Sequence, residues 1–331
     1  MARVAADSEL SLPDQRLVAA LQWDGRIGAE RAARVLGLSP ATVRRRLHAL
    51  TGDGTARVVL SPTARTGNGG PVGALFLRIR VLRGKLDTIV AALAAREDVP
   101  FIDITTAGDE IFAVARTEPG SRDPLVFRQL PSTQAVTSVE SSTLLNVFRL
   151  TSEWRHQVLT AEECAELGGG ASGAPEPAAS PGDPAQDPLD RSLLAALAPD
   201  ARLPVAALAA RTGHPETTVR RRLARLAEQG LLTTQVLVDH RRLGLAIEAK
   251  LLLQVTPDHL AAAGQALADH PSVHGAFATS GPSNLHAAAY FRDLAALYGF
   301  LSRDLTGLGI THLETAVVSR AAKRAAALIP G

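Results

Sequence analysis

The chain contains 331 residues, more than one ordinary hydrophobic core requires, so two or more domains are favoured. Hydrophobic residues make up 46% and charged residues 21%, which excludes a disordered chain. The net charge is only +2, so a nucleic-acid function would need locally clustered arginines. The single cysteine, Cys164, excludes an intrachain disulfide and a CxxC metal site. No apolar h-region opens the chain and no apolar run reaches roughly 18 residues, so we expect a cytoplasmic protein without a membrane partner.

The hexapeptide TVRRRL occurs twice, at 42–47 and again 176 positions later at 218–223. At the same offset Asp14 matches Asp190 and Gly37 matches Gly213. Downstream the match continues after a two-residue adjustment, where LFLRIRV parallels KLLLQVT. The period is about half the chain, which predicts two copies of one module and not a solenoid of short repeats.

Each copy is predicted to open with three short helices. In the second copy an apolar helical pattern follows Asp190, a second helix covers 203–211, and a third lies between Pro215 and Gly230. The first copy has Ser39-Pro40 before its third helix, and these residues suit an N-cap and a first helical position. Three helices with a glycine turn between the last two are typical of a helix-turn-helix.

In the third helix the repeated hexapeptide TVRRRL has an apolar face and a charged face. Val43, Leu47 and Leu50 form one apolar stripe, so Arg45 points away from the core while Arg44 and Arg46 flank the stripe. The first copy has no acidic residue four positions away from its arginines. Such a face suits phosphates and guanine edges, although a solvated charged face is the commoner fate of an arginine run. The predicted DNA-contacting residues are Ser39, Thr42, Arg44, Arg45, Arg46, Thr218, Arg220, Arg221 and Arg222.

The segment after each third helix differs between the copies. In the second copy LLTTQVLVD at 231–239 alternates like a strand and predicts a wing beside the helix. In the first copy the corresponding segment is rich in glycine and predicts no regular wing.

The remainder of each copy predicts the order βαββαβ, an antiparallel sheet with helices on one face. The fold class is therefore α+β, with two repeats that each join a winged helix-turn-helix to a ferredoxin-like βαββαβ domain. The expected elements are strand 74–81, helix 85–96, strands 101–106 and 111–116, helix 124–130 and strand 135–148, then strand 250–256, helix 258–269, strands 274–280 and 285–291, helix 293–305 and strand 310–319. One face of each sheet stays open, so the two sheets would cover each other or pair with another chain.

Two further segments complete the predicted layout. Residues 150–167 are expected to form a helix that docks on the first module, with Trp154 in its packing. The Gly/Ala/Pro-rich stretch after Cys164 is expected to be a flexible linker. The predicted domains are a tail 1–13, helix-turn-helix 14–66, sheet domain 72–163, linker 164–188, helix-turn-helix 189–242 and sheet domain 246–331.

The chain resembles the Lrp/AsnC family of bacterial transcription regulators in a tandem form. The segments that carry the resemblance are DRSLLAALAPDARLPVAALAARTGHPETTVRRRLARLAEQGLL, TSGPSNLHAAAYFRD and LYGFLSRDLTGLGITHLETAVVSRAAKR. The resemblance implies a regulator that binds double-stranded DNA, forms homo-oligomers through its sheets and responds to a small effector, typically an amino acid.

The resemblance also implies an effector site at the turn between the second and third strands of each sheet. These turns are TTAGDE at 105–110 and TSGPSN at 279–284. Both depart from the common family pattern T-G-x-x-D, and a plain polar β-turn is an equal alternative. The implied effector-binding residues are Thr106, Gly108, Asp109, Ser280, Gly281, Ser283 and Asn284.

Enzyme motifs are absent from the sequence, so we expect no catalytic residues, metal or cofactor. His270 and His274 are four apart, but Pro271 interrupts them. The chain also resembles sirohaem decarboxylases, which are tetrapyrrole enzymes of the same fold. That resemblance implies a role for His286 and His312. A third alternative is an effector sensor without DNA function.

Overall fold

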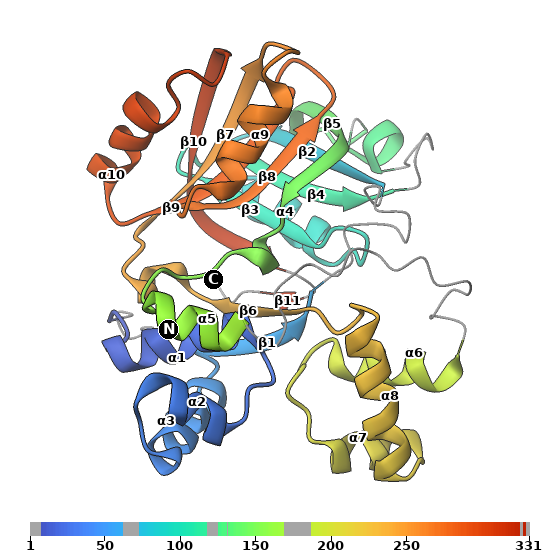
Figure 1. The fold of residues 1–331 in the computed structure, drawn as a ribbon. Coiled ribbons are helices and arrows are strands. Elements are labelled where there is room, and N and C mark those ends of the chain that lie inside the picture. Colours follow the sequence, from blue (N-terminus) through green and yellow to red (C-terminus); the bar gives the residue numbers. More distant parts are fainter. Residues whose placement is uncertain are drawn as a thin grey trace. The chain divides into compact units, whose positions relative to one another are not determined.

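The computed structural model describes residues 8–61, 73–117, 125–130, 132–168, 187–324 and 327–328. The chain divides into two compact units (Figure 1). Described residues before 62, within 151–168 and within 187–244 form a helical unit, and the others form a strand-rich unit. Segments far apart in the sequence therefore share a unit. The two predicted helix-turn-helix segments lie in the helical unit, and the two predicted βαββαβ segments lie in the strand-rich unit.

The helical unit contains the two predicted sets of three helices, each followed by one strand. In chain order its elements are α1 (Leu12–Trp23), α2 (Ala29–Leu36), α3 (Pro40–Gly52), β1 (Ala56–Leu60), a 3₁₀ turn (Thr151–Glu153), α5 (Ala161–Gly168), α6 (Pro188–Leu197), α7 (Val205–Thr212), α8 (Glu216–Glu228), β6 (Thr234–Val238) and a 3₁₀ turn (His240–Leu243).

The predicted apolar stripe of the third helix is confirmed in both sets. Val43, Leu47 and Leu50 are buried on α3, as are their counterparts on α8. Gly37 and Gly213 end α2 and α7 in the left-handed region, at φ of 67° and 69°. The glycines therefore make the turn of each helix-turn-helix, because side chains are disfavoured at that φ.

The strand that follows each third helix pairs with its counterpart. β1 runs antiparallel to β6, with Val58 opposite Val236. The prediction of no regular wing in the first copy is wrong here, since residues 56–60 form a strand. The wing predicted at 231–239 is present as β6, and its partner is β1.

Several predicted boundaries need correction. α1 begins at Leu12, inside the predicted tail, and α5 continues to Gly168, inside the predicted linker. The single helix expected at 150–167 is wrong, because the α-helix begins only at Ala161. Thr160 and Glu163 form a capping box that starts α5 there, and Trp154 is buried as expected. Residues 169–186 of the predicted linker lie outside the described residues.

The strand-rich unit has a first half and a second half with matching element order. The first half contains β2 (Ala74–Val81), α4 (Leu86–Ala94), β3 (Phe101–Thr105), β4 (Glu110–Arg116), a π-helical turn (Leu125–Gln129) and β5 (Val136–Arg149). The second half contains β7 (Ile247–Val255), α9 (Leu260–Asp269), β8 (Val273–Thr279), β9 (Leu285–Phe291), α10 (Leu294–Gly299), a π-helical turn (Phe300–Asp304), β10 (Ile310–Arg324) and β11 (Ala327–Leu328). The helix predicted at 124–130 is reduced to the π-helical turn.

The strands close into one barrel and do not form two open sheets. The order is β10-β3-β4-β2-β5-β8-β9-β7, and β7 pairs back onto β10, which closes a ring of eight strands. β11 adds to the end of β10. We call the β3–β10 pairing the first seam and the β5–β8 pairing the second seam, because these two pairings join the halves.

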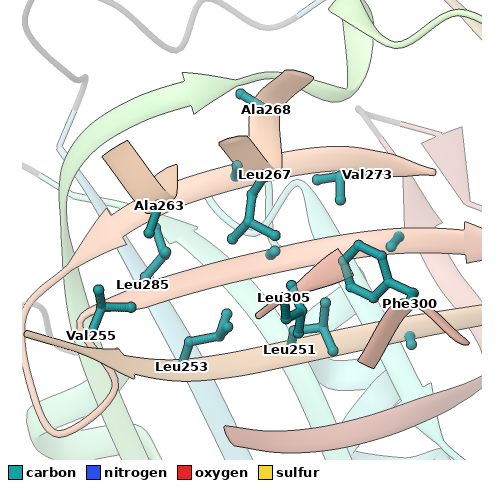
Figure 2. Close-up of a cluster of buried hydrophobic side chains, with 14 of the residues drawn as sticks. Leu251, Leu253, Val255, Ala263, Leu267, Ala268, Val273, Leu285, Phe300 and Leu305 are labelled. Atoms are coloured by element: carbon teal, nitrogen blue, oxygen red, sulfur yellow. The ribbon is translucent and has the colours of Figure 1, made fainter. Parts of the chain in front are cut away.

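Apolar residues on the outer face of the barrel form a core with the helices of each half. In the second half Leu251, Leu253 and Val255 of β7 pack with Ala263 and Leu267 of α9 (Figure 2). The matching core of the first half includes Leu77 and Ile79 of β2. The alternate residues of these strands, such as Phe76, Arg78 and Lys250, therefore line the barrel interior.

Candidate nucleic-acid interface

Ser39 and Thr42 form the start of α3. The Ser39 hydroxyl accepts a hydrogen bond from the backbone N–H of Thr42 at 3.1 Å, and the two hydroxyls lie 2.8 Å apart. Pro40 occupies the first turn. Two of the predicted DNA-contacting residues therefore have a capping role that fixes where α3 begins.

The first arginine of each triplet forms an exposed ion pair. Arg44 pairs with Glu30 of α2, and the side chains of Arg44 and Glu30 remain 60% and 71% exposed to solvent. Arg220 pairs with Glu216, one turn earlier on α8, at 3.0 Å. Exposed pairs of this kind contribute about 0–1 kcal/mol, so both arginines can exchange their carboxylate for another anion.

The third arginine of each triplet is bound to the first helix of its set. Arg46 pairs with Asp14 of α1 at 2.7 Å, and Arg222 pairs with Asp190 of α6 at 3.3 Å. Asp187, the N-cap of α6, adds a contact to Arg222 at 2.6 Å. These arginines are half-buried, and their ion pairs hold the third helix of each set against the first.

The middle arginines, Arg45 and Arg221, are exposed at equivalent positions of α3 and α8. They form no ion pair or hydrogen bond with any residue that the structure describes. Arg45 also borders a shallow surface pocket, where Arg46 and Arg242 supply two further cations and Asp14 and Asp53 supply two acids. The sequence assigned all three arginines of each triplet to DNA contact, whereas the structure places them in three different environments.

A reciprocal arginine clasp joins the two sets of helices. Arg26 donates to the carbonyls of Ala201 and Leu203, and Arg202 donates to those of Gly25 and Ile27 at 2.6 and 3.2 Å. Burial lowers the pKa of both guanidinium groups. Together with the β1–β6 ladder, the clasp fixes the two helix-turn-helix elements to each other.

The clasp and the Asp14 and Asp190 pairs are functional features that the sequence interpretation missed. Asp14, Arg26 and Arg46 recur as Asp190, Arg202 and Arg222 at one constant offset. Because Asp14 and Arg46 recur together as Asp190 and Arg222, the sequence could have predicted one ion pair that forms in both copies. The structure adds that Arg26 and Arg202 each contact the other copy.

The predicted effector turns each lie against a long strand of the other half, the first turn against β10 and the second against β5. The backbone N–H of Thr106 donates to the carbonyl of Val317 on β10, and that of Ser280 donates to the carbonyl of Thr143 on β5, both at 2.9 Å. Gly108 and Gly281 have φ of 77° and 97°, as tight turns require.

Several polar groups of the second turn are already engaged. The Asn284 side chain exchanges two hydrogen bonds with the backbone of Val255, at 2.9 and 2.8 Å. The Ser280 hydroxyl accepts from the N–H of Thr143 at 2.9 Å, and the carbonyl of Ser283 accepts from the Thr279 hydroxyl at 2.8 Å. In the first turn Thr106 is exposed and Asp109 is half-buried.

The two histidines singled out by sequence lie in different environments. His286 faces the barrel interior, where its ring meets that of Phe76 edge-on at 5.5 Å. Its Nε2 is enclosed without a hydrogen-bond partner among the described residues. Burial lowers the pKa of His286 to about 4, although a hydrogen bond with the backbone of Ser283 acts in the opposite direction. His312 of β10 lies opposite Gln254 of β7 and is exposed.

Two further kinds of site, a metal centre and a membrane-spanning helix, are absent from the described residues. Among these residues, no group of three or more His, Cys, Asp or Glu side chains is placed to hold a metal ion. None of the helices in the described part of the chain is long and apolar enough to cross a bilayer.

Two family models match the chain. The AsnC-type helix-turn-helix domain matches residues 13–51 and 187–227, and the Lrp/AsnC ligand binding domain matches residues 248–328. The first model covers the helices of both sets, and the second covers the second half of the barrel.

Curated relatives are transcriptional regulators. The chain is 30% identical over 135 residues to the Bkd operon transcriptional regulator of Pseudomonas aeruginosa, which covers 39% of the chain and 88% of the relative. It is 25% identical over 134 residues to the HTH-type transcriptional regulator LrpA of Pyrococcus horikoshii, covering 40% of the chain and 95% of the relative.

A solved structure resembles the chain over nearly its whole length. The siroheme decarboxylase NirDL aligns with a TM-score of 0.56 at 15% identity and covers 94% of this chain and 92% of its own. At this identity the likeness shows a shared fold alone.

Proposed function

The chain belongs to the Lrp/AsnC family of DNA-binding transcriptional regulators, and from this premise we propose that it contacts double-stranded DNA through the outer faces of α3 and α8. The observation that carries the proposal is the pair of exposed arginines, Arg45 and Arg221, at equivalent positions of the two helices. A guanidinium without an internal partner suits a phosphate or a guanine edge in the major groove.

The neighbouring arginines of each triplet have two different proposed roles, direct phosphate contact and support of the helix from inside the fold. Arg44 and Arg220 exchange their weak carboxylate pairs for phosphate. Arg46 and Arg222 orient the helices from inside, so their loss weakens binding through the fold and not through a lost contact.

The test replaces Arg45, Arg221 or both with alanine and measures DNA affinity across salt concentrations. Each replacement should lower the slope of log affinity against log salt by about one unit, because one phosphate contact is lost. Arg83→Ala is the matched control, since it removes an exposed cation outside the helical unit. An unchanged slope in the double variant would contradict the proposal.

We propose a duplicated layout, in which helix-turn-helix domains within 12–60 and 187–244 share the helical unit and ferredoxin-like halves within 73–150 and 245–328 share the barrel. The matching element order of the halves supports this layout. The segment between α5 and α6 would link the modules.

The ligand-binding domain is proposed to take a small effector, of amino-acid class, beside the turns at 105–110 and 279–284. Thr106, Asp109 and Ser283 are the predicted side chains with polar atoms to offer, because Asn284 and Ser280 are engaged in the fold. Thermal unfolding in the presence of each amino acid tests this. A raised midpoint that Asp109→Ala abolishes supports the site, and no shift with any amino acid contradicts the class.

Tetrapyrrole chemistry is the second candidate function, because NirDL has the same fold and because the buried Nε2 of His286 has no hydrogen-bond partner among the described residues. The interior cations argue against it. Arg78, Lys250 and Arg324 all pair with carboxylates, which leaves them unavailable for the acid groups of a tetrapyrrole. Titration with an iron porphyrinoid distinguishes the functions, because binding would produce a Soret band that His286→Phe weakens.

A further inference from the structure

The two seams of the barrel share one register. Asp103 lies opposite Ala321 at the first seam, and Phe277 lies opposite Val147 at the second. Each residue of the first half therefore has an equivalent 174 positions later in the second half.

The seams also share a pair of clasps at helix ends. Lys323 donates to the carbonyls of Ala94 and Arg96 at the end of α4, at 3.0 and 2.5 Å. Its equivalent, Arg149, donates to the carbonyls of Ala268 and His270 at the end of α9, at 2.6 and 3.0 Å. Cations suit helix C-termini, and these clasps would form whichever halves were paired.

A buried cluster of charges occupies the inner side of the first seam. Asp103 binds Lys250 at 2.8 Å and also pairs with Arg324. Glu248 binds the same two cations, each at 3.0 Å. Two acids thus balance two bases, and Asp103 is the one member that comes from the first half. Glu248 keeps 1% and Asp103 keeps 6% of its side-chain surface, so neither carboxylate can rely on water.

The equivalent four positions at the second seam hold an apolar cluster. Phe277 replaces Asp103, Ala74 replaces Glu248, Phe76 replaces Lys250, and Leu150 replaces Arg324. The rings of Phe76 and Phe277 pack with centroids 5.1 Å apart.

We infer that this exchange of charged for apolar residues makes each half of the barrel complementary to the other half and incompatible with a second copy of itself. Two first halves would bury each Asp103 against Ala74, Phe76 and Leu150, without a cation. Two second halves would bury Glu248, Lys250 and Arg324 against Phe277, with one cation in excess. Burying an unpaired charge is strongly unfavourable, so both like-with-like barrels are excluded.

The barrel therefore closes from one first half and one second half, and one chain supplies both. A second copy of the chain, which the sequence led us to expect as a partner, would have to associate through other surfaces. The closed ring leaves neither seam free for it.

Cysteine cross-linking in full-length chains tests the pairing, in a Cys164→Ser background. Asn146 lies opposite Ala278 at the second seam, within the reach of a disulfide. The equivalent of Ala278 in the first half is Ile104, so Asn146 would lie opposite Ile104 only where two first halves pair.

Three preparations give the answer under oxidising conditions. A chain with both Asn146→Cys and Ala278→Cys should cross-link internally and keep the mass of one chain. A mixture of chains that carry Asn146→Cys or Ala278→Cys alone should give no dimer, and neither should a mixture of Asn146→Cys and Ile104→Cys chains. A dimer from the first mixture would show halves exchanged between chains and would overturn closure of the barrel within one chain. A dimer from the second mixture, or no internal cross-link, would overturn the inference.

A double-mutant cycle tests the charges themselves in the full chain. Asp103→Leu should raise the unfolding equilibrium constant by roughly 10²–10³-fold, because Lys250 and Arg324 lose an acid. Adding Lys250→Leu restores the balance and should reverse much of that change. Asp87→Leu is the control, since Asp87 pairs with Arg320 between the same halves but is exposed. Asp103→Leu and Asp87→Leu variants of equal stability, or no recovery in the double variant, would overturn the inference.

Discussion

Each arginine of the repeated triplet has a role set by its neighbours in space. Helical spacing predicted correctly that Arg45 points away from the apolar stripe. It did not predict that Asp14 of α1 would bind Arg46, because that contact depends on how α1 packs on α3. An arginine that flanks a buried stripe lies within reach of the adjoining helix. If that helix carries an acidic residue at the contact, the arginine forms an ion pair with it and is not available to DNA.

The buried imidazole of His286 predicts a specific acid sensitivity. Its pKa in the fold is about 4, below the ordinary value of 6.5, so the unfolded chain takes up a proton first as pH falls. The contribution of this group to the free energy of unfolding is complete above pH 6.5 and should decrease by about 3 kcal/mol as pH falls to 4. His286→Phe, which copies the equivalent residue Phe112, should remove this part of the dependence. Denaturant unfolding at several pH values measures it, and an identical slope in the variant would contradict the buried neutral imidazole.

At the scale of elements, the β1–β6 ladder depends on a close approach at Gly25. A Cβ placed there would lie 2.4 Å from Thr234 Oγ1 and 2.7 Å from Val58 Cγ1. Gly25→Ala should therefore destabilise the helical unit by about 1–3 kcal/mol, as overpacking does.

Gly52→Ala is the matched control for this prediction. Gly52 ends α3, and a Cβ added to it would meet no atom within 4 Å. Alanine there should therefore be neutral or stabilise the helix by about 0.5–1 kcal/mol. Thermal unfolding of both variants gives the comparison. Equal midpoints would mean that the close approach at Gly25 does not exist.

Local signals predicted the elements well but not their partners. The apolar stripes predicted the third helices, and alternation predicted β2 and β7 close to their observed limits. The strand at 56–60 was missed because the glycines that follow it outweighed ARVVL itself. Its stability comes from β6, far away in the sequence, and no local pattern contains that pairing. The late start of α5 was readable from Thr160 and Glu163, a capping box.

At the scale of the molecule, the sequence predicted two open sheet faces, and the structure closes both into one barrel. Alternation shows which residues face inward, but it does not show which edges meet. The segments 105–110 and 279–284 were predicted correctly as turns. The engagement of Asn284 by β7 could not be predicted, because alternation within one strand does not show which other strand a side chain meets. Asp103 and Phe277 occupy equivalent positions, one charged and one apolar. The meaning of this difference can be inferred only when the strand pairings at the two seams are known.

The closed barrel and the arginine clasp together predict the composition of the DNA complex. One chain carries both α3 and α8, joined by β1–β6, so one chain should occupy a two-part DNA site that a single-module relative would fill as a dimer. Light scattering of the complex should give the duplex mass plus one chain of 34.7 kDa. In that complex Arg45→Ala and Arg221→Ala should each lower the salt slope, and their effects should add because the sites are separate. Two chains on one duplex, with Arg45→Ala silent, would mean that α8 alone reads DNA and that a second chain supplies the other contact.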